Sequence, residues 1–220
     1  MTGPRWAIAL FLIGCGSTPS PSPGHAGAHH LGHRFEDPAQ WVKRLEEPGR
    51  DAWQKPEAVI AWLGLAPDAH VADVGAGTGY FALRLAEAVP QGLVYAVDLE
   101  PGMVAWLSDR AVRTGRDNLR ATLAQPADPH LHTPVDLIFV CDTWHHIPDR
   151  AAWLAAAAGQ LRPGGRIVIV DYKREAEAGP PVTMRLAAEQ VIGELEAGGF
   201  KLLQREDALL PRQYLLAFGR

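Results

Sequence analysis

Between residues 70 and 172, short apolar segments alternate with amphipathic ones, and this alternation limits the possible folds more than any other feature. The apolar segments are candidate strands at 70–74, 93–98, 119–123, 135–142 and 166–172. In the segment after the first strand, Phe81, Leu85 and Ala88 repeat at helical spacing. Apolar strands separated by amphipathic helices predict a parallel sheet with helices on both faces.

The C-terminal part of the chain departs from this alternation. A helical segment at 187–199 is followed by two extended segments, 200–206 and 213–219, which only "DALLPR" separates. A parallel crossover needs a dozen or more residues, so a connection this short favours an antiparallel hairpin. The sequence therefore predicts an α/β fold with a doubly wound, mostly parallel seven-stranded sheet and a C-terminal antiparallel hairpin.

Two helical segments precede the first strand. In "DPAQWVKRLEEPGR" (37–50), Asp37 is a candidate N-cap followed directly by proline, and Pro48-Gly49 is expected to end the helix. "KPEAVIAWLGL" (55–65) predicts a second helix, which Gly64 closes.

The stretch "VADVGAGTGYF" (71–81) lies where a ligand is expected, since ligands of open α/β sheets bind at the carboxyl ends of the strands. Its glycines allow a sharp turn and a close approach of the ligand to the backbone. A dinucleotide fingerprint is G-x-G-x-x-G, but Tyr80 occupies the slot of the third glycine. An NAD(P)-dependent oxidoreductase is therefore the weaker alternative.

Two acids near the turn indicate a different ligand. Asp73 can accept hydrogen bonds from a cationic amino group, and Asp98, at the end of the second strand, can take both hydroxyls of a ribose. A ligand with an ammonium group, a ribose and an adenine but no phosphates fits these residues. S-adenosylmethionine (SAM) has these parts.

Four motifs in order, "DVGAGTGY", "VYAVDLEPGM", "VDLIFVCDTWHHI" and "LRPGGRIVIVDY", make the chain resemble the class I SAM-dependent methyltransferases. The resemblance extends from about residue 50 to residue 220 and is to the branch with the ubiquinone/menaquinone-type C-methyltransferases. It implies a Rossmann-like fold, SAM as cofactor and a small-molecule or lipid-soluble methyl acceptor. It also implies cofactor contacts from Asp73, Gly75, Ala76, Gly77, Gly79, Asp98, Leu99 and Asp142.

One family motif is missing. After the third strand the family usually has G-D-A, whose acid contacts the adenine, whereas this chain reads "LAQPADPHL" (123–131). Gln125 and Asp128 are the two candidates for that contact, and the sequence leaves both open.

The acceptor side is expected after the fourth and fifth strands. His145 and His146 are candidates for a general base, and the alternative is that they pack or hydrogen-bond their loop. Trp53, Trp144 and Tyr172 are candidates for acceptor binding, and Lys173 is a further candidate. The alternative for Tyr172 and Lys173 is that they are exposed loop residues. No metal is expected.

In related methyltransferases the segment before the core helix folds over the cofactor, which makes 50–56 ("RDAWQKP") a candidate lid. Its candidate lid residues are Arg50, Trp53 and Gln54. Alternatively, Trp53 packs the N-terminal helices onto the sheet.

The N-terminus resembles a bacterial lipoprotein signal. One positive charge precedes an apolar run, 6–13, which is too short for a bilayer span of about 20 residues, and "LIGC" ends at Cys15, the expected lipidated residue. The predicted organisation is a signal peptide at 1–15, a flexible tether at 16–36 and the methyltransferase domain at 37–220, with helices and lid at 37–64. The alternative is a misassigned start codon. The tether contains four histidines, which we interpret as part of a solvated linker.

A working signal would place the domain in the cell envelope, anchored to the membrane through Cys15, and otherwise the cytoplasm is expected. SAM is made in the cytoplasm, so an anchored domain also raises the alternative of a non-catalytic protein that binds SAM or a nucleoside. The formal net charge of −4 gives no basic footprint, so nucleic acid is not expected as a partner.

Overall fold

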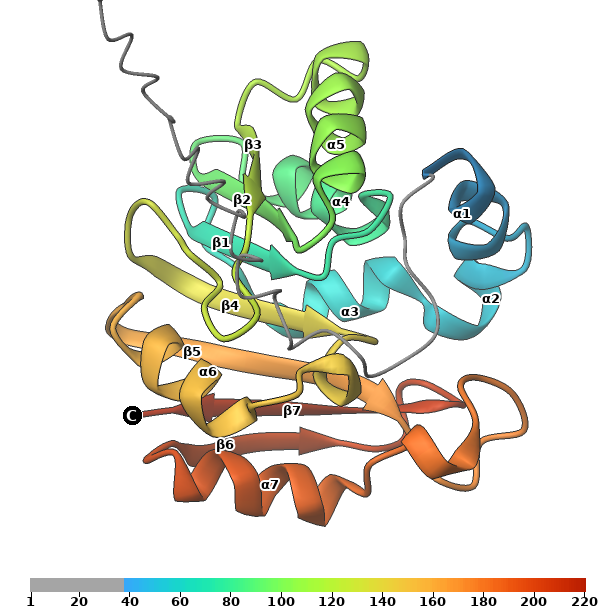
Figure 1. The fold of residues 1–220 in the computed structure, drawn as a ribbon, viewed down its shortest axis with the longest axis vertical. Helices are drawn as coiled ribbons and strands as arrows, with labels where there is room; N and C mark the ends of the chain where they lie inside the picture. The colour runs from blue at the N-terminus through green and yellow to red at the C-terminus, as the bar shows by residue number, and fades with distance from the viewer. Residues whose placement is uncertain (1–37) are drawn as a thin grey trace, which may run out of the picture. The chain divides into compact units, whose positions relative to one another are not determined.

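The computed structural model describes residues 38–220 (Figure 1), so the signal peptide, Cys15, the tether and Asp37 lie outside the described residues. Seven strands form one sheet in the order β3-β2-β1-β4-β5-β7-β6. β1 to β5 are mutually parallel, and β7 is antiparallel to both β5 and β6. The strands are β1 His70–Val74, β2 Leu93–Asp98, β3 Leu119–Leu123, β4 Val135–Cys141, β5 Leu161–Tyr172, β6 Lys201–Glu206 and β7 Gln213–Gly219. The predicted fold is confirmed.

Helices pack on both faces of the sheet because each has one apolar side. The helices are α1 Pro38–Leu45, α2 Arg50–Gln54, α3 Pro56–Leu63, α4 Tyr80–Ala88, α5 Pro101–Arg113, α6 Arg150–Ala158 and α7 Ala188–Ala197. Buried side chains of α3, α4 and α5 form one core cluster with the sheet, and those of α6 and α7 form a second. Figure 1 shows α6 in front of the sheet.

The boundaries differ from the prediction around β5. The strand begins at Leu161, five residues earlier than expected, where Leu161 pairs with Val135 ahead of a register shift. Pro163 cannot donate a backbone hydrogen bond and Gly164 has φ +78°, so the helix before them ends at Ala158 and the chain turns directly into the strand.

The β3–β4 connection is a loop, as predicted, and Gln160 holds it. Its Nε2 donates to Asp128 Oδ1 (2.6 Å), and its Oε1 accepts the N–H of Leu131 (2.6 Å). Farther along the loop, Thr133 Oγ1 lies 2.8 Å from the Tyr95 hydroxyl of β2. These bonds hold the loop on the face of the sheet that a helix would otherwise cover.

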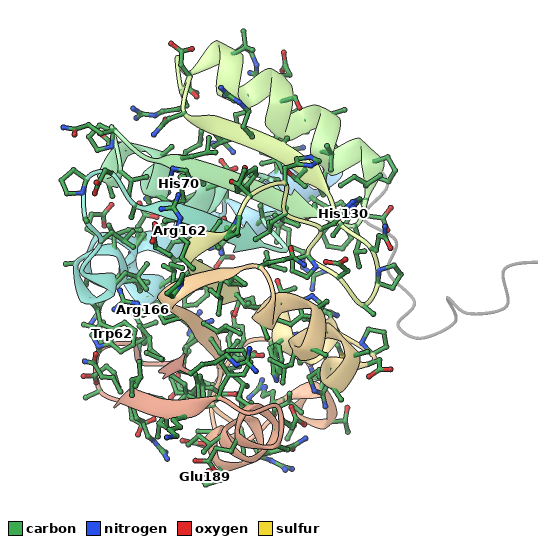
Figure 2. All side chains as sticks on the ribbon, turned by 90° about the vertical axis from the view of Figure 1, so that its left-hand side faces the viewer. Trp62, His70, His130, Arg162, Arg166 and Glu189 are labelled. Atoms are coloured by element: carbon green, nitrogen blue, oxygen red, sulfur yellow. The ribbon has the colours of Figure 1, made fainter. Side chains whose placement is uncertain are left out.

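Side-chain hydrogen bonds connect the parallel strands where they begin, at the end of the sheet that we call the amino edge (Figure 2). Arg162 donates to Asp136 (2.8 Å) and to His70 Nδ1 (2.9 Å), which joins β5, β4 and β1. Arg166 donates to the carbonyl of Leu63, the last residue of α3. These bonds connect the amino ends of β1, β4 and β5 and join β5 to α3. No helix among residues 38–220 is both long enough and apolar enough to cross a bilayer.

Candidate functional site

The glycine turn between β1 and α4 is a backbone structure that few residue types can form. Gly75, Gly77 and Gly79 have φ of +74°, +53° and +96°. The N–H groups of Gly75 and Ala76 donate to the carbonyl of Val97 (2.8 and 3.0 Å), which fixes the turn against β2. A Cβ on Gly75 would overlap the side chain of Thr143, so this position requires glycine for space as well as for conformation.

Asp98 bonds to the turn from the end of β2. Its Oδ2 accepts the N–H of Gly77 (2.9 Å) and its Oδ1 accepts the N–H of Glu100 (3.0 Å). Burial raises the pKa of Asp98 above its usual value, although these hydrogen bonds act in the opposite direction. Each carboxylate oxygen can accept a further bond, so the pair can take two hydroxyls.

Asp73 is a buried acid beneath the same turn. It is 3% exposed, and burial raises its pKa to about 7, with Arg50 lowering it and Asp98 raising it further. A carboxylate in this position favours a cationic ligand. Thr78, in the turn, is buried and its hydroxyl has no partner within the part of the chain that the structure describes.

These features fit SAM. Asp73 suits the ammonium group and Asp98 suits the ribose. Leu99 leaves half of its apolar surface exposed beside Asp98, as a neighbour of an adenine would. The turn offers no third glycine for a pyrophosphate, because Tyr80 begins α4 there.

Tyr80 has a different role, since it anchors the N-terminal helices. Its hydroxyl donates to Asp51 (2.5 Å), and the guanidinium of Arg50 lies 3.8 Å from its ring centroid. Leu45, at the end of α1, has its Cδ1 3.2 Å from the position of a Cβ on Gly77. The segment formed by α1, α2 and the residues between them, 38–54, therefore lies over the turn; we call it the lid segment.

A second set of contacts joins the lid segment to a network of hydrogen-bonded side-chain amides. Gln54 Nε2 lies 3.1 Å from Asp142 Oδ2, 3.0 Å from Gln213 Oε1 and 3.2 Å from Cys141 Sγ. Gln213, the first residue of β7, donates to the other oxygen of Asp142. Arg50 donates to Gln54 Oε1 (2.5 Å). The network joins the lid segment to the end of β4 and the start of β7.

Asp142 is the centre of this network. It is one of three non-glycine residues of the described chain with a positive φ, at +56°. Burial raises its pKa to about 6, against the opposing charge of Arg50. The bonds from both glutamines fix an acid whose backbone conformation is itself unfavourable.

The structure distinguishes the environments of His145 and His146, which the sequence left equivalent. His145 Nδ1 lies 2.9 Å from Oδ1 of Asp171, a fully buried acid in β5. Within residues 38–220 no protein atom bonds its Nε2. Burial by itself lowers the pKa of His145, but the bond to Asp171 and its charge outweigh this and raise it above 6.5. The side chain of His146 is exposed.

Trp53 and Tyr172, both predicted for the acceptor side, are brought together. Their ring centroids are 5.9 Å apart with an interplanar angle of 38°. The guanidinium of Arg212 lies 5.0 Å from the ring centroid of Trp53. Together the two rings form an aromatic wall beside Cys141, whose thiol pKa burial raises well above its usual value.

Trp144 and Lys173 do not fit the predicted role. Trp144 is fully buried, packs edge-to-face on Trp153 and donates to Glu194 (3.0 Å), so it belongs to the core under α6 and α7. The short 3₁₀ turn after Asp142 directs it there. The Nζ of Lys173 donates to the carbonyls of Asp207 and Leu210, so it braces the β6–β7 connection.

Gln125 and Asp128, the two candidates for the contact with the adenine, also differ in their surroundings. Asp128 is engaged by Gln160 and by the N–H of His130 (2.7 Å), so its carboxylate holds the β3–β4 loop. Gln125 follows the end of β3 with its side chain exposed, and its role stays a prediction. Among the described residues, no three His, Cys, Asp or Glu side chains are close enough to hold a metal.

Two site residues, Asp171 and Gln213, were missed by the sequence analysis. A signal for Asp171 existed, because Asp98 and Asp142 also stand at or just after the end of an apolar strand. Gln213 gave no signal, since only the antiparallel insertion of β7 beside β5 brings it to this edge.

Comparisons with known proteins agree with the site. Residues 71–165 match a family described as methyltransferase domain. Over 175 residues the chain is 31% identical to malonyl-[acyl-carrier protein] O-methyltransferase of Methylococcus capsulatus, covering 71% of this chain and 60% of that protein. Over 102 residues it is 34% identical to the protein of the same name in Hahella chejuensis, covering 44% and 34%. The chain thus spans only about a third to three fifths of the length of these relatives.

A solved structure extends the likeness to the whole described domain. The crystal structure of a SAM-dependent methyltransferase from Aquifex aeolicus superposes with a TM-score of 0.76 at 26% identity. It covers 83% of this chain and 97% of that one. The fold is therefore that of the SAM-dependent methyltransferases, and SAM is the cofactor that the fold, the domain family and the residues of the turn have in common.

Proposed function

We propose, from the match of residues 71–165 to a methyltransferase domain, that the chain transfers a methyl group from SAM to a small-molecule or lipid-soluble acceptor. The observation that carries the proposal is the glycine turn with an acid on each side, the buried Asp73 and the partly buried Asp98. The turn and the two acids offer complementary groups for the ammonium, the sulfonium charge and the ribose, and none for a phosphate.

When bound, SAM supplies an activated methyl group on a sulfonium. The chain's own task is to align the acceptor, exclude water and take up a proton where the acceptor carries one. The lid segment over the turn serves the exclusion of water. The aromatic wall of Trp53 and Tyr172, beside the end of β4, serves the alignment.

His145 is the proposed general base. Asp171 accepts the Nδ1–H, which leaves the unbonded Nε2 to take the proton of an acceptor hydroxyl, and the buried carboxylate then stabilises the imidazolium. The related proteins named O-methyltransferases support an oxygen nucleophile.

We further propose that the acceptor carries a phenolic ring. The aromatic wall favours a planar ring, and a phenol has the hydroxyl proton that His145 would remove. A lipid-soluble acceptor of this kind would also suit an enzyme held at a membrane.

Calorimetry with SAM, S-adenosylhomocysteine and NAD tests the cofactor. We expect micromolar binding of the first two and no binding of NAD; binding of NAD alone would sink the proposal in favour of an oxidoreductase. Turnover is tested by transfer of labelled methyl groups from SAM into aqueous and lipid extracts. Binding without any labelled product in either extract would favour the non-catalytic alternative.

The membrane anchor is a separate part of the proposal and rests on the sequence of residues 1–36. The apolar run, "LIGC" and the polar tether support lipidation of Cys15 and a location in the cell envelope, with the cytoplasm as the alternative. Mass spectrometry of membrane fractions would detect a lipid-modified Cys15. An intact peptide that begins at Met1 would contradict the anchor without affecting the methyltransferase assignment.

A further inference from the structure

The side chain of Arg110 bonds both the glycine turn and Glu46 of the lid segment. It lies on α5, away from the strand ends, and the sequence motifs do not include it. Its NH1 donates to the carbonyl of Thr78 (2.8 Å), in the middle of the turn. The same guanidinium binds both carboxylate oxygens of Glu46, directly after α1, with NH2 3.1 Å from Oε2.

We propose that Arg110 is a positioning residue for SAM, and that the Glu46–Arg110 pair latches the lid segment over the bound cofactor. This inference rests on the proposed function. The pair must separate before α1 can move away from the turn, so it sets the rate at which the cofactor leaves.

The geometry of the pair distinguishes it from an ordinary surface ion pair. The side chains of Arg110 and Glu46 are only 21% and 23% exposed, and the contact is a two-oxygen one, which is the stronger and more directional form. For comparison, Asp109 and Arg113 on the same helix are 63% and 55% exposed and meet through one hydrogen bond, from Arg113 Nε to Asp109 Oδ2 (2.7 Å).

The latch also acts on the turn itself. Thr78 stands between two glycines with positive φ, and its own hydroxyl has no partner among the described residues. Arg110 holds the Thr78 carbonyl, while the N–H of the same peptide, on Gly79, donates to the carbonyl of Ala76 (2.9 Å), so the two bonds together fix this peptide. Leu45, one residue before Glu46, packs over Gly77. Removing Glu46 would therefore loosen the lid segment while leaving the bond between Arg110 and Thr78 in place.

The test compares E46Q with D109N, which removes the exposed pair on the same helix. Dissociation of SAM is measured by stopped-flow tryptophan fluorescence on the full chain. We expect E46Q and R110Q each to speed dissociation about tenfold, the double variant to add little, and D109N to stay within twofold of the wild type. E46D, which keeps the charge, should recover most of the slow rate.

Tryptic cleavage after Lys43 and Arg44 gives a second readout. SAM should protect these bonds in the wild type and in D109N but much less in E46Q. A purely structural role would make E46Q less stable but leave the dissociation rate unchanged, and that result overturns the latch. Failure of the wild type to bind SAM would instead overturn the proposed function, so the two failures are distinguishable.

Discussion

The carboxyl edge of the sheet is the end at which the parallel strands stop. Its two halves are built in different ways. The cofactor half, at the ends of β1 and β2, consists of a turn of consecutive residues, 73–79, and one acid that bonds to its backbone. The proposed acceptor half, at the ends of β4 and β5 and the start of β7, consists of side chains from distant segments; the Gln54–Gln213 bond joins residues 159 positions apart. The first is thus a local structure, whereas the second exists only once the whole sheet and the lid segment have assembled.

This difference predicts that substitutions in the two halves separate cofactor binding from chemistry and from stability. The largest effect is expected in the acceptor half. D171N removes the acid that orients His145 and stabilises its charged form, so we expect kcat to fall about 100- to 1000-fold while the Kd for SAM changes less than twofold. The measurement is methyl transfer under saturating SAM, with calorimetry for the Kd.

His146 supplies the control for this prediction. Its exposed side chain makes H146Q a near-neutral change in kcat, within about threefold, whereas H145Q should match D171N. Equal losses in H145Q and H146Q would mean that the bond between His145 and Asp171 has no special part in the reaction.

The next effect belongs to the cofactor half. D98N replaces an oxygen that accepts the N–H of Gly77 or Glu100 by an amide, and it removes the charge that would bind the ribose hydroxyls. Charge-assisted hydrogen bonds contribute roughly 1.5–3 kcal/mol each, so the Kd for SAM should rise about 100-fold. D136N, at the amino edge, is the matched control and should leave the Kd unchanged.

Asp73 makes cofactor binding depend on pH. Its pKa in the free protein is about 7, so its ionised fraction falls about tenfold between pH 8 and pH 6. If the ammonium of SAM binds the carboxylate, the affinity should fall about tenfold over the same interval. D73N should bind weakly and show no such dependence, and a wild-type affinity that stays constant over this interval would remove Asp73 from the cofactor contacts.

The smallest effect tests whether the amide network serves stability more than binding. Q54L takes a donor from the partly buried Asp142, so the free energy of unfolding at pH 8 should fall by about 1 kcal/mol. The folded-state pKa of Asp142 is raised to about 6, so its charge opposes folding as pH rises through this value. The part of the effect that comes from Asp142 should therefore be lost at pH 4.5 in urea denaturation. A loss that is equal at both pH values would assign the effect to packing and to the bonds of Gln54 with Gln213 and Arg50.

The same contrast explains what the sequence could and could not predict. Strand ends, a glycine turn and the acid that ends β2 are fixed by neighbours in the chain, so Asp73, Gly75 and Asp98 could be placed from a local pattern. Apolar periodicity and the short final connection were enough for the sheet and its hairpin.

Residues of the acceptor half could be named but not given their roles. Trp144 and His145 are adjacent in the sequence, yet the 3₁₀ turn buries the first against Trp153 and directs the second to Asp171. Such a division depends on how one turn is packed, which no local pattern reveals. Arg110 is a further case, because its two partners come from segments 32 and 64 positions away.

The insertion of β7 between β5 and β6 has a consequence for how the protein is made. Among the strands of residues 38–220, β6 pairs only with β7, so on the ribosome it has no place in the sheet until residues 213–219 have been synthesised. All seven residues of β7 are buried, and the first is Gln213. A nascent chain that has reached Glu206 can already form the cofactor turn, but it lacks a donor to Asp142 and leaves the edge of β5 open. Translation that stops early thus yields a product without a complete acceptor half, and its open edge marks it for chaperones and proteases.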